Sequence, residues 1–215
     1  MVKRSVVTTK RSLIMLVLVL GVALATGTLV LANADGHGDG AQAIAPGRLT
    51  GESLVKYLTI LKAVAKYHDI EKAKADGYIP VGPVVPNMGQ HYLNPQLAEK
   101  PLDLTRPPIL EYVPDGTGNW YLIGVEFLSH PGHVPDETPL GIGAWDVHEA
   151  ACHYKDGSEI KEASAEKCPK TNNGADLAEW HPDLVGYHIW LIPDAEGNVV
   201  SPMNTYLGAL TAPPM

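Results

Sequence analysis

Apolar residues recur at helical spacing in one long segment of the chain that follows the N-terminal region. Leu54, Leu58 and Leu61 lie three or four positions apart, with lysines at positions between them, which is the pattern of an amphipathic helix. Thr50 is suited to cap this helix, and Ser53 is a second candidate. We therefore expect a helix that begins near residue 50.

A shorter helix is expected from Ile70 to Ala75, before Gly77, where helical spacing gives way to short apolar runs separated by prolines. Proline excludes long helices there, and four runs have strand composition: Ile109–Val113, Trp120–Leu128, Trp145–Tyr154 and Leu184–Ile192. Asp115-Gly116 is a turn signal that should join the first two strands in a hairpin. The prediction is an α+β fold, with an N-terminal helix packed on a mostly antiparallel β-sheet and long ordered loops.

The N-terminal region has the form of an export signal. Four basic residues precede an apolar run, 13–31, and Ala32-Asn33-Ala34 is a small-x-small cleavage sequence. We predict a signal peptide over 1–34, a flexible linker over 35–47 and a single globular domain over 48–215. The apolar run approaches the roughly 20 residues that cross a bilayer, so an uncleaved N-terminal anchor is the alternative. Both readings place the domain outside the cytoplasm.

Charge excludes two classes of partner. All 24 acidic residues but only 12 of the 16 basic ones follow Ala34, so the exported part has a net charge of −12. Such a chain is repelled by nucleic acids and by anionic membrane surfaces. The partners that we expect are a metal ion or a small ligand, with a membrane involved only if the N-terminal segment stays uncleaved. The sequence does not determine the oligomeric state.

The two cysteines, Cys152 and Cys168, predict a disulfide, because thiols pair in an oxidising compartment. A bridge of this span stabilises the fold by about 3 kcal/mol through loss of chain entropy in the unfolded state. It would close the polar, lysine-rich segment between the two cysteines.

The segment WDVHEAACHY, residues 145–154, contains two histidines, His148 and His153. A zinc-protease helix needs its histidines at i and i+4, whereas these are at i and i+5. On a helix they would point about 140° apart, and on a strand they would face opposite sides. The protease reading therefore fails, and we expect a strand that contributes at most one ligand, His148, to a site assembled from several segments.

Three other polar residues stand in apolar surroundings: Glu126 in YLIGVEFL, His188 in LVGYHIWL and His91 in MGQHYLNP. Burying a carboxylate is costly unless it meets a cation or a donor. With His148, these residues form a sufficient first coordination shell for Zn, Mn, Fe or Cu. We predict a metal site at His91, Glu126, His148 and His188, and the alternative is a buried hydrogen-bond network that needs no ion.

The remaining histidines have other assignments. His130 and His133 flank a proline-glycine turn and are expected in a solvated loop, while His68 and His181 are expected at the surface. Cleavage after Ala34 would expose Asp35-Gly36-His37, whose amine, amides and imidazole form a square-planar set for Cu(II) or Ni(II). The competing reading of that tripeptide is a disordered linker.

Several segments together resemble a family of uncharacterised secreted proteins of bacteria and archaea. The matching segments span most of the exported chain: DGYIP (76–80), MGQHYLNP (88–95), PPILEYVP (107–114), LIGVEF (122–127) and HIWL (188–191). The family implies no established activity, but the resemblance includes His91, Glu126 and His188. The chain departs from the family pattern after HIWL, and its 148–168 segment is outside the resemblance, which weakens the case for His148.

Three functional hypotheses follow. The first is an extracytoplasmic protein that binds a transition metal or small ligand through the His/Glu cluster. The second is a structural or surface-assembly protein with a buried hydrogen-bond network, and the third is a metal-dependent hydrolase or oxygenase. Catalytic motifs such as G-x-S-x-G are absent from the sequence, so no reaction is predicted. If there is one, Glu126 is the natural general base.

Overall fold

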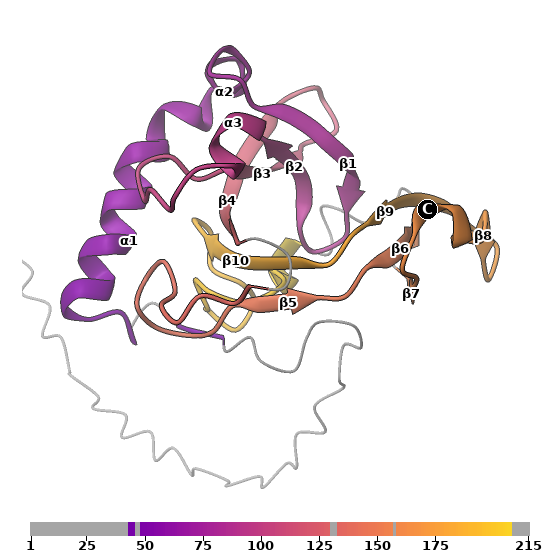
Figure 1. Cartoon of the computed structure of the whole chain (residues 1–215). Coiled ribbons are helices and arrows are strands. Elements are labelled where there is room, and N and C mark those ends of the chain that lie inside the picture. The colour runs from indigo at the N-terminus through magenta and orange to yellow at the C-terminus, as the bar shows by residue number, and fades with distance from the viewer. Residues whose placement is uncertain (1–42, 46–47, 130–132, 157, 208–215) are drawn as a thin grey trace, which may run out of the picture. The chain divides into compact units, whose positions relative to one another are not determined.

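The computed structural model of the 215-residue chain describes residues 43–45, 48–129, 133–156 and 158–207. These residues belong to one compact unit, Ala34–Met215 (Figure 1). The predicted signal peptide and most of the predicted linker lie outside the described residues. Within the described part, no helix is both long enough and apolar enough to span a membrane.

The predicted α+β class is confirmed, and both predicted helices are present. The long helix α1 is Gly51–Val64, and the Ser53 hydroxyl accepts a hydrogen bond from the backbone N–H of its N-cap, Thr50, at 3.1 Å. The short helix α2 is Ile70–Ala75, capped by Asp69. The other helical turns are η2 (Ala65–His68), α3 (Pro95–Ala98), η3 (Ala165–Lys167) and η4 (Thr205–Leu207).

Six strands form the main sheet, in the order β1-β2-β3-β4-β10-β5, and every neighbouring pair is antiparallel. Their bounds are Ile79–Val85 (β1), Gly89–Leu93 (β2), Ile109–Pro114 (β3), Trp120–Ser129 (β4), Leu184–Trp190 (β10) and Asp146–His148 (β5). The expected hairpin through Asp115-Gly116 is present as β3–β4. β1 and β2 were not expected, because Pro80 and Pro83 interrupt β1. Proline is tolerated there because β1 is an edge strand.

A second sheet has four strands in the order β7-β6-β9-β8. They are Glu159–Lys161 (β7), Ala151–Tyr154 (β6), Ala175–His181 (β9) and Thr171–Asn172 (β8). The predicted single strand over 145–154 was wrong, because the chain breaks after His148 and enters two sheets as β5 and β6. At the break, the Ala150 N–H donates to the Asp183 carboxylate at 2.8 Å, and Asp183 lies in the turn between β9 and β10. The β5–β6 segment and the β9–β10 segment thus pass side by side from one sheet to the other (Figure 1).

The predicted disulfide between Cys152 and Cys168 is confirmed, with the Cα atoms 5.7 Å apart. It ties β6 to the turn η3. Ile44, which falls within the predicted linker, is buried and pairs with Val200 through an isolated antiparallel bridge. The ordered domain therefore starts before residue 48.

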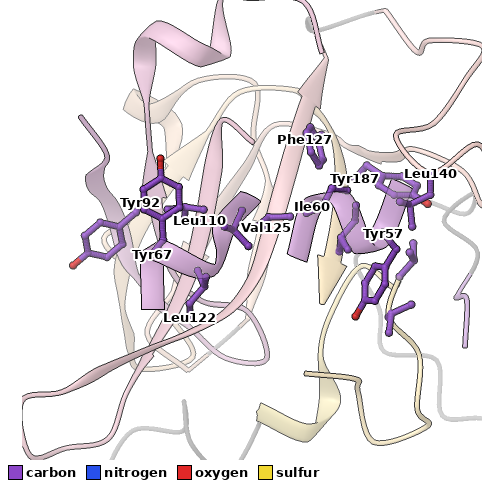
Figure 2. Packing of buried hydrophobic residues seen from close by; sticks show 14 of the residues in the cluster. Tyr57, Ile60, Tyr67, Tyr92, Leu110, Leu122, Val125, Phe127, Leu140 and Tyr187 are labelled. Atoms are coloured by element: carbon purple, nitrogen blue, oxygen red, sulfur yellow. The ribbon is translucent and has the colours of Figure 1, made fainter. Parts of the chain in front are cut away.

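The hydrophobic core lies between the main sheet and α1 (Figure 2). Tyr57, Ile60 and Val64 of α1 pack against side chains of one sheet face, such as Val125 and Phe127. The buried stripe of α1 is thus not the leucine stripe that the spacing suggested. Leu54 and Leu58 are 39% and 53% exposed, because the helix presents its aromatic and β-branched stripe to the sheet. This core covers one sheet face only, and leaves the other face for the site.

Candidate metal centre

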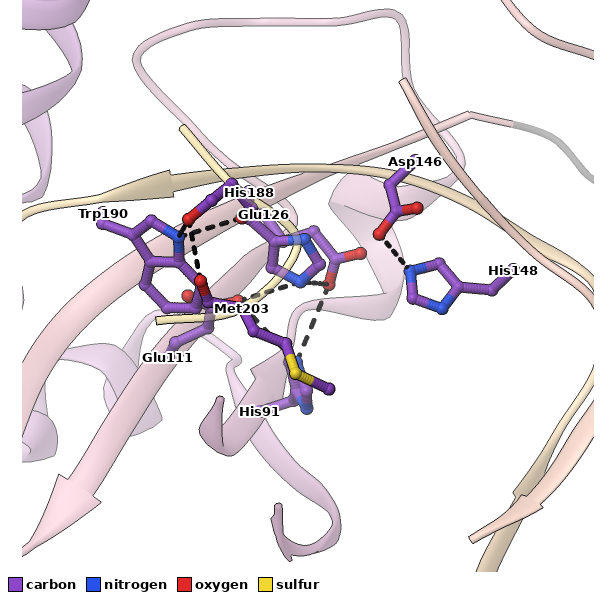
Figure 3. A network of polar contacts seen from close by, with 9 residues as sticks. His91, Glu111, Glu126, Asp146, His148, His188, Trp190 and Met203 are labelled. Atoms are coloured by element: carbon purple, nitrogen blue, oxygen red, sulfur yellow. Dashed lines mark hydrogen bonds and ion pairs between the residues drawn. The ribbon is translucent and has the colours of Figure 1, made fainter. Parts of the chain in front are cut away.

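Four adjacent strands of the main sheet each contribute one ionisable side chain to the face opposite α1. These residues are His91 on β2, Glu111 on β3, Glu126 on β4 and His188 on β10. His91 is paired with Glu111, and His188 with Glu126, in the strand register. Directly paired residues of antiparallel strands present their side chains on the same face, close together. We call these four residues the His/Glu cluster (Figure 3).

The register of β3 and β4 places the two carboxylates of the cluster on one face. Glu111 is opposite Gly124, and Gly124 lies two residues before Glu126 on β4. Residues two apart on a strand face the same side of the sheet, so Glu111 and Glu126 share one face although each lies in a predominantly apolar strand. The pairing shifts only after Glu111, where Ile123 is the extra residue, as in a β-bulge.

Two glycines leave the space that the carboxylates occupy. A Cβ atom at Gly124 would overlap the Glu111 carboxylate, and one at Gly186 would overlap the Glu126 carboxylate. Neither glycine has a positive φ angle, so backbone conformation does not explain why glycine is present at these positions. The reason is close approach: any side chain there would displace a cluster residue.

The polar atoms of the cluster lie at distances that suit coordination better than hydrogen bonding. His188 Nε2 is 3.3 Å from Glu111 Oε1 and 3.8 Å from Glu126 Oε2. His91 Nε2 is 3.7 Å and 3.9 Å from the same two oxygens. Direct N–H···O hydrogen bonds are about 2.7–3.2 Å long. Ligands that each lie about 2.0–2.2 Å from one ion are separated by roughly 3–4 Å, which matches these spacings.

The cluster is deeply buried. Glu111 is fully buried, His188 is 3% exposed and Glu126 5% exposed. Neither oxygen of Glu111 has a hydrogen-bond partner within the described residues. A buried polar group without a donor costs about 1–3 kcal/mol, so an uncompensated Glu111 disfavours the fold. One ligand atom from each of the four residues lies within 4.8 Å of all the others, so the cluster could hold a metal ion.

Burial drives the cluster toward neutral forms. It raises the pKa of Glu111 well above its ordinary value, and the nearby Glu126 carboxylate adds to this. Burial also raises the pKa of Glu126 to about 7, although His148 opposes the shift. The same effect lowers the pKa of His91 to about 4. Neutral imidazoles are ready to coordinate, whereas the carboxyl groups would release protons when an ion binds.

His188 is held in place by an aromatic neighbour. Its ring stacks on the indole of Trp190 with the centroids 5.6 Å apart and an angle of 12° between the planes. Trp190 Nε1 in turn donates to the carbonyl oxygen of Ser201 at 2.9 Å. The orientation of the imidazole is therefore supported by packing and hydrogen bonding around it, as in preorganised metal sites.

The structure brings together three of the four residues that the sequence suggested as ligands, and places the fourth beside them. His148 Nε2 lies 2.7 Å from Asp146 Oδ2, and its ring centroid is 6.5 Å from that of His188. Burial lowers the pKa of His148, but the hydrogen bond to Asp146 and the charges of Asp146, Glu126 and Glu159 together outweigh it, and the pKa is raised. His148 is thus a neighbour of the cluster rather than a member (Figure 3).

Glu111 is the cluster residue that sequence reasoning missed. It stands in the strand Ile109–Val113, between Leu110 and Tyr112, which is the same signal that singled out Glu126. The argument that a carboxylate inside an apolar strand needs a partner applies equally to both residues.

The other histidines are distributed as follows. His68 and His133 are exposed, as expected. His181 was expected at the surface but is partly buried, and its ring centroid lies 4.8 Å from that of His153. Both of these rings line a cavity next to the cluster. His130 and the predicted copper site Asp35-Gly36-His37 lie outside the described residues.

The chain matches no protein-family model, no curated protein sequence and no solved structure. The functional argument consequently rests on the geometry of the cluster and its surroundings.

Proposed function

We propose that this protein is an extracytoplasmic metal-binding protein that holds one divalent transition-metal ion between His91, Glu111, Glu126 and His188. The observation that carries the proposal is the pair of buried carboxylates, Glu111 and Glu126, set between two imidazoles at coordination spacing. Glu111 has no hydrogen-bond donor in the described part of the chain. An ion would supply the missing partner to Glu111 and would bind Glu126 at the same time.

Ligand chemistry restricts the ion. Two carboxylates balance the charge of a divalent ion, and two imidazoles favour Zn, Mn, Fe or Cu over Mg and Ca, which prefer oxygen ligands throughout. Four side-chain ligands are also the usual complement of a zinc site. The donor set does not separate these four metals, so the metal is assigned by class.

The compartment follows from independent features. The disulfide between Cys152 and Cys168 is typical of proteins that fold in an oxidising environment. The basic flank, apolar run and cleavage sequence at the N-terminus are the features of a secretory signal. Export as a soluble protein is the reading that we propose for the mature chain.

The competing structural role is less well supported. A buried network that serves stability should have well-formed hydrogen bonds, because partly satisfied networks are worse than an apolar core. The four ion-pair distances within the cluster, 3.3–3.9 Å, are all longer than such bonds. By contrast, Asp146 Oδ2 and His148 Nε2, in the same sheet, are 2.7 Å apart, which is within the hydrogen-bond range.

Elemental analysis of the exported full-length protein, purified without chelator, tests the proposal. We expect close to one equivalent of a transition metal, and its loss in the variant His91→Ala/His188→Ala. The matched control is His68→Ala/His133→Ala, which removes two exposed histidines and should leave the metal content unchanged. Metal-free protein after incubation with Zn, Mn, Fe and Cu would contradict the proposal, as would equal metal loss in both variants.

A further inference from the structure

A cavity of about 260 Å³ lies against the His/Glu cluster. Three cluster residues, His91, Glu126 and His188, are among the residues that line it, whereas Glu111 is not. An ion held by all four residues would therefore have Glu111 on its inner side and the cavity on the other. A ligand in the cavity would have direct access to the ion.

Apolar side chains from four strands form most of the cavity wall. Val81 comes from β1, Leu93 from β2, Ile109 from β3, and Leu128 from β4. An apolar cavity of about 150 Å³ accommodates a benzene molecule, so this one has room for an aromatic ring with a short substituent. The polar lining residues are Glu126, Glu179 and five histidines, and mainly apolar walls with a small number of polar groups are the usual form of a small-molecule site.

Charge around the cavity disfavours an anion. Among the described residues that line it there is no lysine and no arginine, whereas Glu126 and Glu179 are both present. Of the five histidines that line it, His148 has a raised pKa, but its ring is paired with the Asp146 carboxylate at 2.7 Å. Two cluster carboxylates already balance a divalent ion, so an anionic ligand would leave an excess negative charge. Burying an unbalanced charge is costly. A neutral ligand avoids this cost and can still offer an oxygen to the ion.

We propose that the cavity binds a small, neutral, mainly apolar molecule that carries a hydroxyl or carbonyl oxygen, with this oxygen directed to the metal ion. The proposal rests on the proposed metal site. The apolar part of the ligand would fill the space between Val81 and Leu128, and the oxygen would lie beside His91 and Glu126. Binding affinity then comes from apolar burial, and orientation comes from the ion.

Cobalt(II) reports ligand binding directly, because its visible absorption changes when a ligand reaches the ion, and it suits nitrogen and oxygen donors. The Co(II)-loaded full-length protein is titrated with benzyl alcohol, benzoate and ethanol. Benzyl alcohol has both the apolar body and the neutral oxygen, benzoate has the body with an anionic group, and ethanol lacks the body. We expect saturable spectral changes with benzyl alcohol at a Kd at least ten-fold lower than with either of the others.

Cavity variants separate binding in the cavity from binding elsewhere. Val81 is paired with His91 in the strand register, so Val81→Phe should fill the cavity beside the ion and weaken benzyl alcohol binding at least ten-fold. Ile79→Phe is the matched control, because Ile79 lies two residues away on the same strand, is 51% exposed and does not line the cavity. Leu184→Phe, from β10, is a second cavity-filling variant. All three variants should bind Co(II) as the unmodified protein does.

The outcomes distinguish this inference from the proposed function. Failure to bind Co(II) would overturn both. Tight Co(II) binding with a spectrum that benzyl alcohol does not change would overturn the ligand site and leave the metal site standing. Benzoate binding as tightly as benzyl alcohol would overturn the assignment of a neutral ligand, because the cavity would then not discriminate against an anion. Equal effects of Val81→Phe and Ile79→Phe would show that the cavity is not the binding site.

Discussion

The two faces of the main sheet differ in the side chains that they bury and in how the polar groups among them are hydrogen-bonded. The face toward α1 is apolar and aromatic, and the buried tyrosines between helix and sheet donate to backbone carbonyls: Tyr57 of α1 to Trp190 at 3.1 Å, Tyr112 of β3 to Tyr67 at 2.6 Å and Tyr187 of β10 to Ile142 at 2.8 Å. The face with the His/Glu cluster buries two carboxylates and two imidazoles at spacings too long for hydrogen bonds. On one face the polar groups make hydrogen bonds within the protein, whereas on the other the Glu111 oxygens have no hydrogen-bond partner among the described residues.

This difference separates residues that maintain the fold from residues that are kept for binding. Apolar burial and paired hydroxyls stabilise the domain. A buried carboxylate without a hydrogen-bond donor, such as Glu111, destabilises the domain until a cation binds it. Strain of this kind in one place, within an otherwise well-packed sheet, is a feature of functional sites.

The largest effect on stability is expected on the α1 face. Phe127 is 1% exposed in the main core, and Phe127→Ala should lower the free energy of unfolding by about 3–5 kcal/mol, because it removes apolar contacts and leaves a cavity. Chemical denaturation measures this. If Phe127→Ala lowered the free energy of unfolding by less than any single variant of the His/Glu cluster does in the metal-free protein, the division between the two faces would be contradicted.

Metal binding should stabilise the protein through the other face. A divalent ion at a hundred-fold excess over its Kd should raise the free energy of unfolding by about 2.7 kcal/mol. Thermal unfolding with and without the ion, and after chelator, measures the effect. The double variant His91→Ala/His188→Ala should not be stabilised by the ion. Phe127→Ala should gain as much stability from the ion as the unmodified protein does, although it is less stable without the ion.

Substitution of Glu111 by an uncharged residue should stabilise the metal-free protein, whereas most substitutions in a core destabilise it. Glu111→Gln should stabilise the metal-free protein by about 1–3 kcal/mol at pH 8, because it removes a buried carboxylate, and it should abolish metal stabilisation. The folded-state pKa of Glu111 is raised above its ordinary value of 4.5. Its contribution to stability is therefore fully present below pH 4.5 and is lost as the pH rises through the raised value.

The gain from Glu111→Gln should accordingly be smaller at pH 5 than at pH 8, as measured by denaturation of the metal-free protein at both values. Glu99→Gln is the control, since Glu99 is exposed, and it should change stability little at either pH. A loss of stability in Glu111→Gln at pH 8 would indicate that the carboxylate is satisfied within the protein.

The smallest effect is expected from a single hydrogen bond on the α1 face. Tyr112→Phe removes the donor to the Tyr67 carbonyl and should cost about 1 kcal/mol, the usual net value of one buried bond. Its response to metal should equal that of the unmodified protein. A change in metal affinity would show that the two faces are coupled through β3.

Local sequence determined much of the scaffold. Helical spacing located α1, glycine and proline located the ends of α2 and several strands, and two cysteines implied their own disulfide. Glu126 and His188 were identified because each stands in an apolar strand, where an ionisable side chain requires an explanation. These features depend on a residue and its near neighbours, so a single sequence is enough to predict them.

Tertiary structure decided which residues meet. The pairing of β2, β3, β4 and β10 brings Glu111 to the same face as Glu126. His148 lies two residues from Asp146 on β5 and contacts that carboxylate instead of joining the cluster. Register is set by contacts between segments far apart in the chain, so strand composition predicted β3, β4 and β10, and only the fold determined that side chains from β2, β3, β4 and β10 share one site.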